Sequence, residues 1–201
     1  MKQFLLLLCL TVFTLANSQE KIELYAFGFS MEAPKEWFTQ ESEDDLRENL
    51  NRLDLTPELK DVFLKNLSEK GTYMAFYKYD FKKYSGIIPT INLIIKKING
   101  KNYEHFKKVL EATEKKYPEI IKNYKTVSIK DIMISGNKAI QIVNTYNIAD
   151  ATGREADLRS ISTYFYRGNY YIKLILIEEI GKENNTEVYE TVLKSIDLTI
   201  D

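Results

Sequence analysis

Residues able to perform catalysis or to hold a metal ion are few in this sequence. Its 201 residues include one His, His105, and one Cys, Cys9. A serine hydrolase needs a His beside a Ser and a carboxylate, and a Gly-x-Ser-x-Gly turn that would present such a Ser is missing. Zinc sites are built from several Cys and His ligands. We therefore expect no catalytic residue, no metal site and no cofactor, and we expect His105 on a solvated helix face.

Carboxylates are the remaining candidates for chemistry. Asp150, Glu155 and Asp157 share a loop with Gly153, and carboxylates in a loop that contains Gly can bind Ca²⁺. The alternation of ligands that an EF-hand requires is missing, so we interpret this segment as a solvated hairpin loop. The formal net charge is −1, and the Lys residues are interleaved with Glu, which indicates that nucleic acid is not a partner.

Tyrosine is the residue type that best indicates a binding surface, because its ring offers contact area with a polar tip. The sequence has 14 Tyr, and three of them, Tyr164, Tyr166 and Tyr171, flank a predicted two-residue turn at Gly168-Asn169. That turn places Tyr166 opposite Tyr171 on one face of a hairpin. We expect these three residues to form a binding surface; the alternative is that Tyr is simply a favourable strand residue.

The elements that must position these side chains follow from periodicity and turn residues. Alternating apolar residues predict strands, and apolar residues spaced by three or four predict helices. The predicted strands are 22–31, 72–79, 91–97, 127–134, 139–148, 158–167 and 170–179, and the predicted helices are 42–53, 56–71, 103–117 and 186–195. The order predicts an α+β fold, a central antiparallel sheet flanked by helices. The single Trp, Trp37, is expected to be buried.

The first 18 residues have the pattern of a secretory signal peptide. Lys2 precedes an apolar run over residues 4–15, and small residues follow at 16–18. Cys9 lies too early for a lipoprotein cleavage site. We expect cleavage after Ser18, a single domain over 19–201 with no transmembrane segment, and a periplasmic or secreted location.

Several segments resemble the PsbP-like family. The stretch Phe-Gly-Phe-Ser-Met-Glu-Ala-Pro-Lys-Glu-Trp at 27–37 resembles the opening of those domains, and Ile-Ser-Gly-Asn-Lys-Ala at 134–139 and Tyr-Phe-Tyr-Arg-Gly-Asn-Tyr-Tyr at 164–171 follow in the same order. The Ran-binding Mog protein and bacterial DcrB-type proteins are similar. The resemblance implies an α/β/α sandwich and a non-enzymatic accessory or binding role. A nuclear-transport-factor-like cone and a lipid-binding β-grip are competing architectures.

Three functions are compatible with these observations. The first is an exported, non-catalytic accessory or binding domain that contacts an unknown envelope or secreted protein. The second is a carrier of a lipid or another apolar small ligand between sheet and helices. The third is a hydrolase or isomerase that uses carboxylates alone, which would require two buried acids in one pocket.

Overall fold

The computed structural model of the chain describes residues 20–39, 57, 71–80, 82–99, 101–150 and 152–199. The predicted signal peptide, and the two helices predicted between residues 42 and 71 apart from Pro57 and Gly71, lie outside these ranges. Every statement about structure below concerns the described residues.

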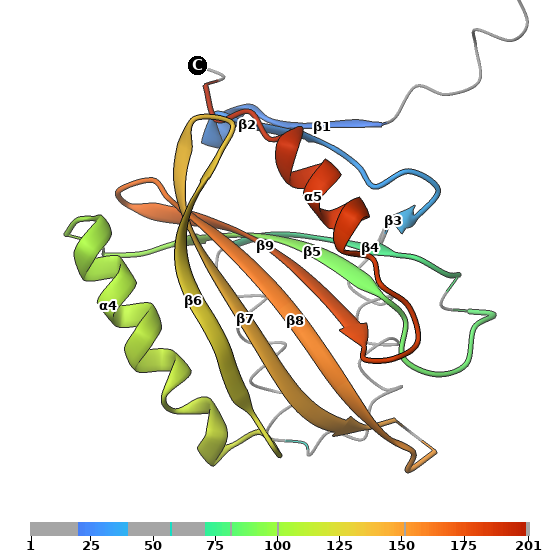
Figure 1. Cartoon of the computed structure of the whole chain (residues 1–201). Helices are drawn as coiled ribbons and strands as arrows, with labels where there is room; N and C mark the ends of the chain where they lie inside the picture. Colours follow the sequence, from blue (N-terminus) through green and yellow to red (C-terminus); the bar gives the residue numbers. More distant parts are fainter. Residues whose placement is uncertain are drawn as a thin grey trace, which may run out of the picture.

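A seven-stranded antiparallel sheet organises the described chain (Figure 1). Its strands run in the order β3-β4-β5-β9-β8-β7-β6. Their bounds are β3 Phe38–Thr39, β4 Gly71–Tyr77, β5 Thr90–Lys97, β6 Lys125–Ile134, β7 Asn137–Ala149, β8 Glu155–Tyr166 and β9 Tyr170–Glu179. The predicted α+β class with a central antiparallel sheet is confirmed.

Two tight turns set the register of the β6–β9 half of the sheet. Ser135 and Gly136 both have positive φ angles, 47° and 78°, as the two central residues of a type I′ hairpin turn require. The β8–β9 turn aligns Tyr166 with Tyr171, as its two-residue loop predicts. The predicted register of the β8–β9 hairpin is therefore confirmed, and the side chains predicted to share one of its faces do share it.

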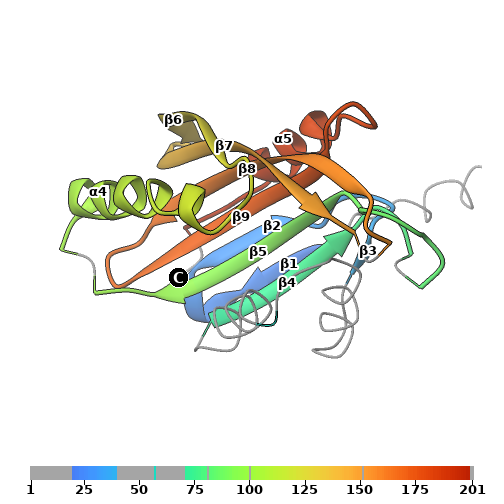
Figure 2. The ribbon, with the colours of Figure 1, turned by 90° about the horizontal axis from the view of Figure 1, so that it is seen from below.

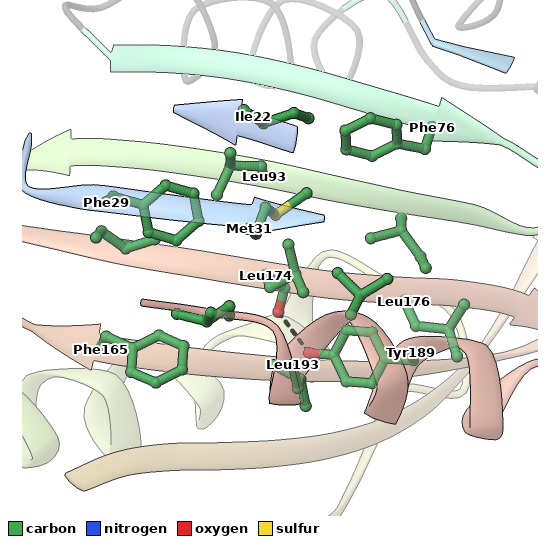
Figure 3. Close-up of a cluster of buried hydrophobic side chains, with 14 of the residues drawn as sticks. Ile22, Phe29, Met31, Phe76, Leu93, Phe165, Leu174, Leu176, Tyr189 and Leu193 are labelled. Atoms are coloured by element: carbon green, nitrogen blue, oxygen red, sulfur yellow. Dashed lines mark hydrogen bonds between the residues drawn. The ribbon is translucent and has the colours of Figure 1, made fainter. Parts of the chain in front are cut away.

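One face of the sheet is covered by a small second sheet and a helix. β1 (Lys21–Leu24) and β2 (Phe29–Glu32) form an antiparallel pair, and α5 (Thr186–Lys194) packs beside them. Figure 3 shows the side chains that fill this layer, and the Tyr189 hydroxyl there donates a hydrogen bond of 2.8 Å to the Leu174 carbonyl oxygen. Trp37 is half-buried against this core, less enclosed than predicted.

The prediction of one continuous strand over 22–31 is wrong. The chain leaves β1 through a 3-10 turn, η1 (Tyr25–Phe27), and reverses at Gly28, whose φ of 53° is left-handed. Glycine adopts this conformation without the steric penalty that a side chain would impose. Gly28 therefore marks a reversal of the chain, and the two halves of the predicted strand, β1 and β2, pair with each other.

The other face of the sheet carries α4 (Tyr103–Glu114), followed by the 3-10 turn η2 (Tyr117–Glu119). Asn102 caps α4, because its side-chain oxygen accepts a hydrogen bond of 2.8 Å from the backbone N–H of His105. Figures 1 and 2 both show α4 beside the β8–β9 turn. Consecutive residues of a strand point to opposite faces, so Phe165 faces α5 while Tyr164 and Tyr166 face α4.

Candidate protein-binding surface

The hairpin tyrosines lie beneath α4 and contact one phenylalanine of that helix. The ring of Phe106 is 5.4 Å from that of Tyr166, 5.5 Å from that of Tyr171 and 6.2 Å from that of Tyr164, measured between centroids. Tyr164 is 7% exposed, whereas Tyr166 and Tyr171 are half-buried. The structure thus brings the three predicted binding residues together, but it packs them into a small core. Their role in binding stays a prediction, restricted to the exposed parts of Tyr166 and Tyr171.

Burial raises the pKa of two of these tyrosines. Burial raises the pKa of Tyr171 to about 12, and it raises the pKa of Tyr164 above its usual value as well. The Lys173 ammonium lies 5.1 Å from the centroid of the Tyr164 ring, a cation–π distance. These shifts move the pKa of Tyr164 and Tyr171 further from neutral pH, so the two phenols contribute packing rather than proton transfer.

A buried carboxylate lies further along α4. Glu114 is 6% exposed, and it accepts a hydrogen bond of 2.6 Å from the Tyr124 hydroxyl and one of 3.3 Å from the Thr126 hydroxyl. Burial and the neighbouring Glu114 raise the pKa of Tyr124. These bonds join the end of α4 to the start of β6. The other buried acids of the described residues bond elsewhere, Asp150 to Thr152 and Arg154 and Glu178 to Arg159 and Asn185.

Of the three acidic residues expected to share a loop, only Asp150 lies between β7 and β8, because β8 begins at Glu155. All three carboxylates form bonds within the protein. The Asp150 side chain accepts hydrogen bonds from the Thr152 and Arg154 backbone N–H groups, and Arg154 also forms an ion pair with Glu179. The Thr152 hydroxyl also donates a hydrogen bond to the Asp150 carboxylate. This bond, together with those from the two backbone N–H groups, lowers the pKa of Asp150 to about 2. Glu155 forms an ion pair with Lys122.

Asp157 accepts a hydrogen bond of 3.3 Å from the side-chain amide of Asn147. Within the described ranges, no group of three His, Cys, Asp or Glu side chains could hold a metal ion. His105 is exposed on α4, as expected.

The edge strand β6 presents a different kind of surface. Among the strands of the described residues it is the last of the sheet, and β7 is the one strand that pairs with it there. The i-to-i+3 bond of the turn makes Ile134 and Asn137 a hydrogen-bonded pair, so Ile132 and Lys130 are hydrogen-bonded to β7 as well. The alternate residues Ile129, Asp131 and Met133 then direct their backbone N–H and C=O groups away from the sheet.

The side chains of β6 add apolar contact area and positive charge to these backbone groups. Val127 and Met133 are 61% and 64% exposed, which is high for large apolar side chains. Lys125 and Lys130 are exposed, and neither forms an ion pair with a described residue. The negative charge of Asp131 is already balanced, because the Lys107 ammonium lies 2.8 Å from its carboxylate. The Tyr103 hydroxyl also donates a hydrogen bond of 2.8 Å to that carboxylate.

Sequence reasoning assigned this strand but missed the open edge. The only available signal is that apolar residues occupy both alternating sets of positions, Val127, Ile129 and Met133 in one and Ile132 and Ile134 in the other. Which strand ends a sheet depends on pairings between distant segments, and these are not visible in a local pattern.

No family model matches this chain, and no curated protein sequence matches it either. The solution structure of cyanobacterial PsbP (CyanoP) from Synechocystis sp. PCC 6803 matches it with a TM-score of 0.50 at 10% identity, covering 90% of this chain and 94% of that one. This chain has a PsbP-like fold. The architecture implied by the residues at 27–37, 134–139 and 164–171 is thereby confirmed.

Two further solved structures are similar to this PsbP-like domain. The Ran-binding protein Mog1p from Saccharomyces cerevisiae matches with a TM-score of 0.48 at 7% identity, over 90% of this chain and 96% of that one. A structure from Bacteroides thetaiotaomicron VPI-5482 matches with a TM-score of 0.49 at 14% identity. That match covers 90% of this chain and 48% of the other, so this chain spans about half the length of that protein. At these identities the similarity concerns the fold alone.

A search for membrane-spanning helices in the described segments finds none that is both long and apolar enough.

Proposed function

We propose that this PsbP-like domain is an exported accessory protein that binds another protein and performs no catalysis. The observation that carries the proposal is the open edge of β6, where exposed Val127 and Met133 adjoin backbone groups directed outward. Large exposed apolar side chains are ordinary when scattered, but next to an unpaired strand edge they favour a protein-contacting surface. The export half of the proposal depends on the signal-peptide pattern at residues 1–18.

The tyrosine cluster is the second surface to consider. Its rings pack against Phe106, and only the exposed parts of Tyr166 and Tyr171 could contact a partner. Aromatic residues often contribute most of the binding energy of an interface, so this rim stays a proposed contact that the same experiment tests.

Carriage of a lipid or other apolar ligand is the less supported alternative. A carrier needs an apolar cavity between sheet and helices. The layer between the sheet and α5 is filled by side chains, among them Phe29, Met31 and Leu174, none of which has measurable exposure (Figure 3). That packing favours protein binding over carriage on this face.

The test is capture of partners from an envelope extract with immobilised protein, analysed by mass spectrometry. The variant Val127→Glu/Met133→Glu should lose a partner that the wild type retains. Val109→Glu is the matched control, because Val109 is also apolar and 48% exposed but lies on α4. Tyr166→Ser addresses the tyrosine rim.

Two results would contradict the proposal. Equal recovery by the wild type and the β6 variant would move the contact away from this edge, and recovery of a bound lipid without any protein would favour carriage. N-terminal sequencing of the native protein should begin near Gln19, and an intact Met1 in the cytosolic fraction would refute export.

A further inference from the structure

The edge of β6 has a chemistry that specifies the kind of partner. Its bonding pattern leaves the backbone groups of Ile129, Asp131 and Met133 directed outward, and among the described residues no hydrogen bond to them is found. A strand edge in this state can accept a further strand, which would complete the missing half of the ladder. The ten residues of β6 give an edge of roughly 30 Å.

The irregularity of β6 divides that edge into two parts. The register between β6 and β7 shifts between Thr126 and Ser128, which is a bulge. Bulges and lysines are devices that protect an edge from indiscriminate pairing. The regular part runs from Ser128 to the turn, so an added strand would pair there first.

Charge distinguishes between the possible occupants. Lys125 and Lys130 are exposed and have no ion pair with a described residue, while Asp131 is held by Lys107. In an antiparallel pairing with a second copy, the lysines of both copies would line one seam, and like charges close together across strands are destabilising. An extended segment that carries carboxylates would instead offset both lysines.

We propose that β6 binds an extended acidic segment of a partner protein, which adds as a strand along Ile129–Met133. The proposal rests on the proposed function and names its partner class. Met133 and Val127 would contact apolar side chains of the added strand, and Lys125 and Lys130 would pair with its carboxylates. The orientation of the added strand is antiparallel or parallel to β6 according to the segment that binds.

Amide hydrogen exchange measured by NMR gives a direct test with a defined probe. The probe is a capped octapeptide that alternates Val and Glu, and the control peptide alternates Val and Lys. The acidic peptide should slow exchange at the N–H groups of Ile129, Asp131 and Met133, because these gain hydrogen bonds. Lys130 and Ile132 already bond to β7, and their exchange should change little. Absence of protection at the three outward amides at millimolar acidic peptide would overturn the proposal.

Two variants separate the contributions of backbone and charge. Met133→Pro removes an outward N–H without removing a bond to β7, and Met133→Thr is its matched control because it keeps the N–H. We expect binding of the acidic peptide to weaken at least tenfold in Met133→Pro and less than threefold in Met133→Thr. Lys125→Glu/Lys130→Glu should weaken it about tenfold and reverse the preference toward the Lys peptide.

The two levels of inference fail in different ways. If wild-type protein captures a protein partner but the three β6 amides keep their exchange rates in that complex, strand addition is wrong and the binding function stands. If Met133→Pro does not fold, the charge-reversed variant decides the matter, and unchanged peptide preference in that variant overturns the proposal.

Discussion

The packing of Phe106 can be tested by truncating its side chain. Phe106 is 4% exposed, and its ring contacts three tyrosine rings of the β8–β9 hairpin. It also packs against Ile140 and Ile142, so the surroundings are held by the sheet and cannot collapse fully into the space. Phe106→Ala should therefore cost about 3–5 kcal/mol of unfolding free energy, the range for a large buried aromatic residue. For a domain of this size that corresponds to a melting temperature lowered by roughly 6–20 °C.

Urea unfolding followed by Trp37 fluorescence measures this loss, since Trp37 is the only Trp and packs against the main core. Val109→Ala is the control on the same helix, because Val109 is largely exposed and its replacement should change stability by less than about 0.5 kcal/mol. A loss below about 1 kcal/mol for Phe106→Ala would refute the reasoning. The tyrosines would then be a surface that α4 covers loosely, and their proposed role in binding would gain support.

The hairpins could be predicted because each depends on a few neighbouring residues. Gly168-Asn169 sets the β8–β9 turn, and the turn length fixes which side chains lie opposite each other. The β6–β7 turn is shorter than predicted, because β7 begins at Asn137 and not at residue 139. The prediction that Tyr164 and Tyr166 point to the same face of the sheet is therefore confirmed. What covers that face was not determined, because the covering residue, Phe106, is some sixty positions away in sequence and its helix could have packed on either face.

The main error concerns Gly28. A Gly within an alternating apolar run is compatible with a bulge, a close approach or a reversal, and local sequence does not distinguish them. Reversal is favoured because the two halves then pair with each other and fold over the main sheet. Phe29 and Met31 are fully buried in that arrangement. Similarly, the edge position of β6 follows from β5 pairing with β9, a contact between segments about eighty residues apart.

Two further predictions address the core and its ionisable groups. Trp37→Ala should cost about 2 kcal/mol, less than a fully buried Trp, because Trp37 is half-buried against the main core; a loss near zero in urea unfolding would place it outside that core. The buried tyrosines predict a loss of stability at alkaline pH. Burial raises the pKa of Tyr171 to about 12, above the value near 10 of an unfolded Tyr, so the contribution of this residue is complete below about pH 10. As pH rises from about 10 toward 12, the unfolded chain releases its protons while the folded chain keeps them, and unfolding is favoured. Urea midpoints should therefore fall between about pH 10 and 12, and Tyr171→Phe, which has no proton to lose, should show a smaller fall. An equal fall in both proteins would mean that the Tyr171 hydroxyl titrates as if it were exposed to solvent.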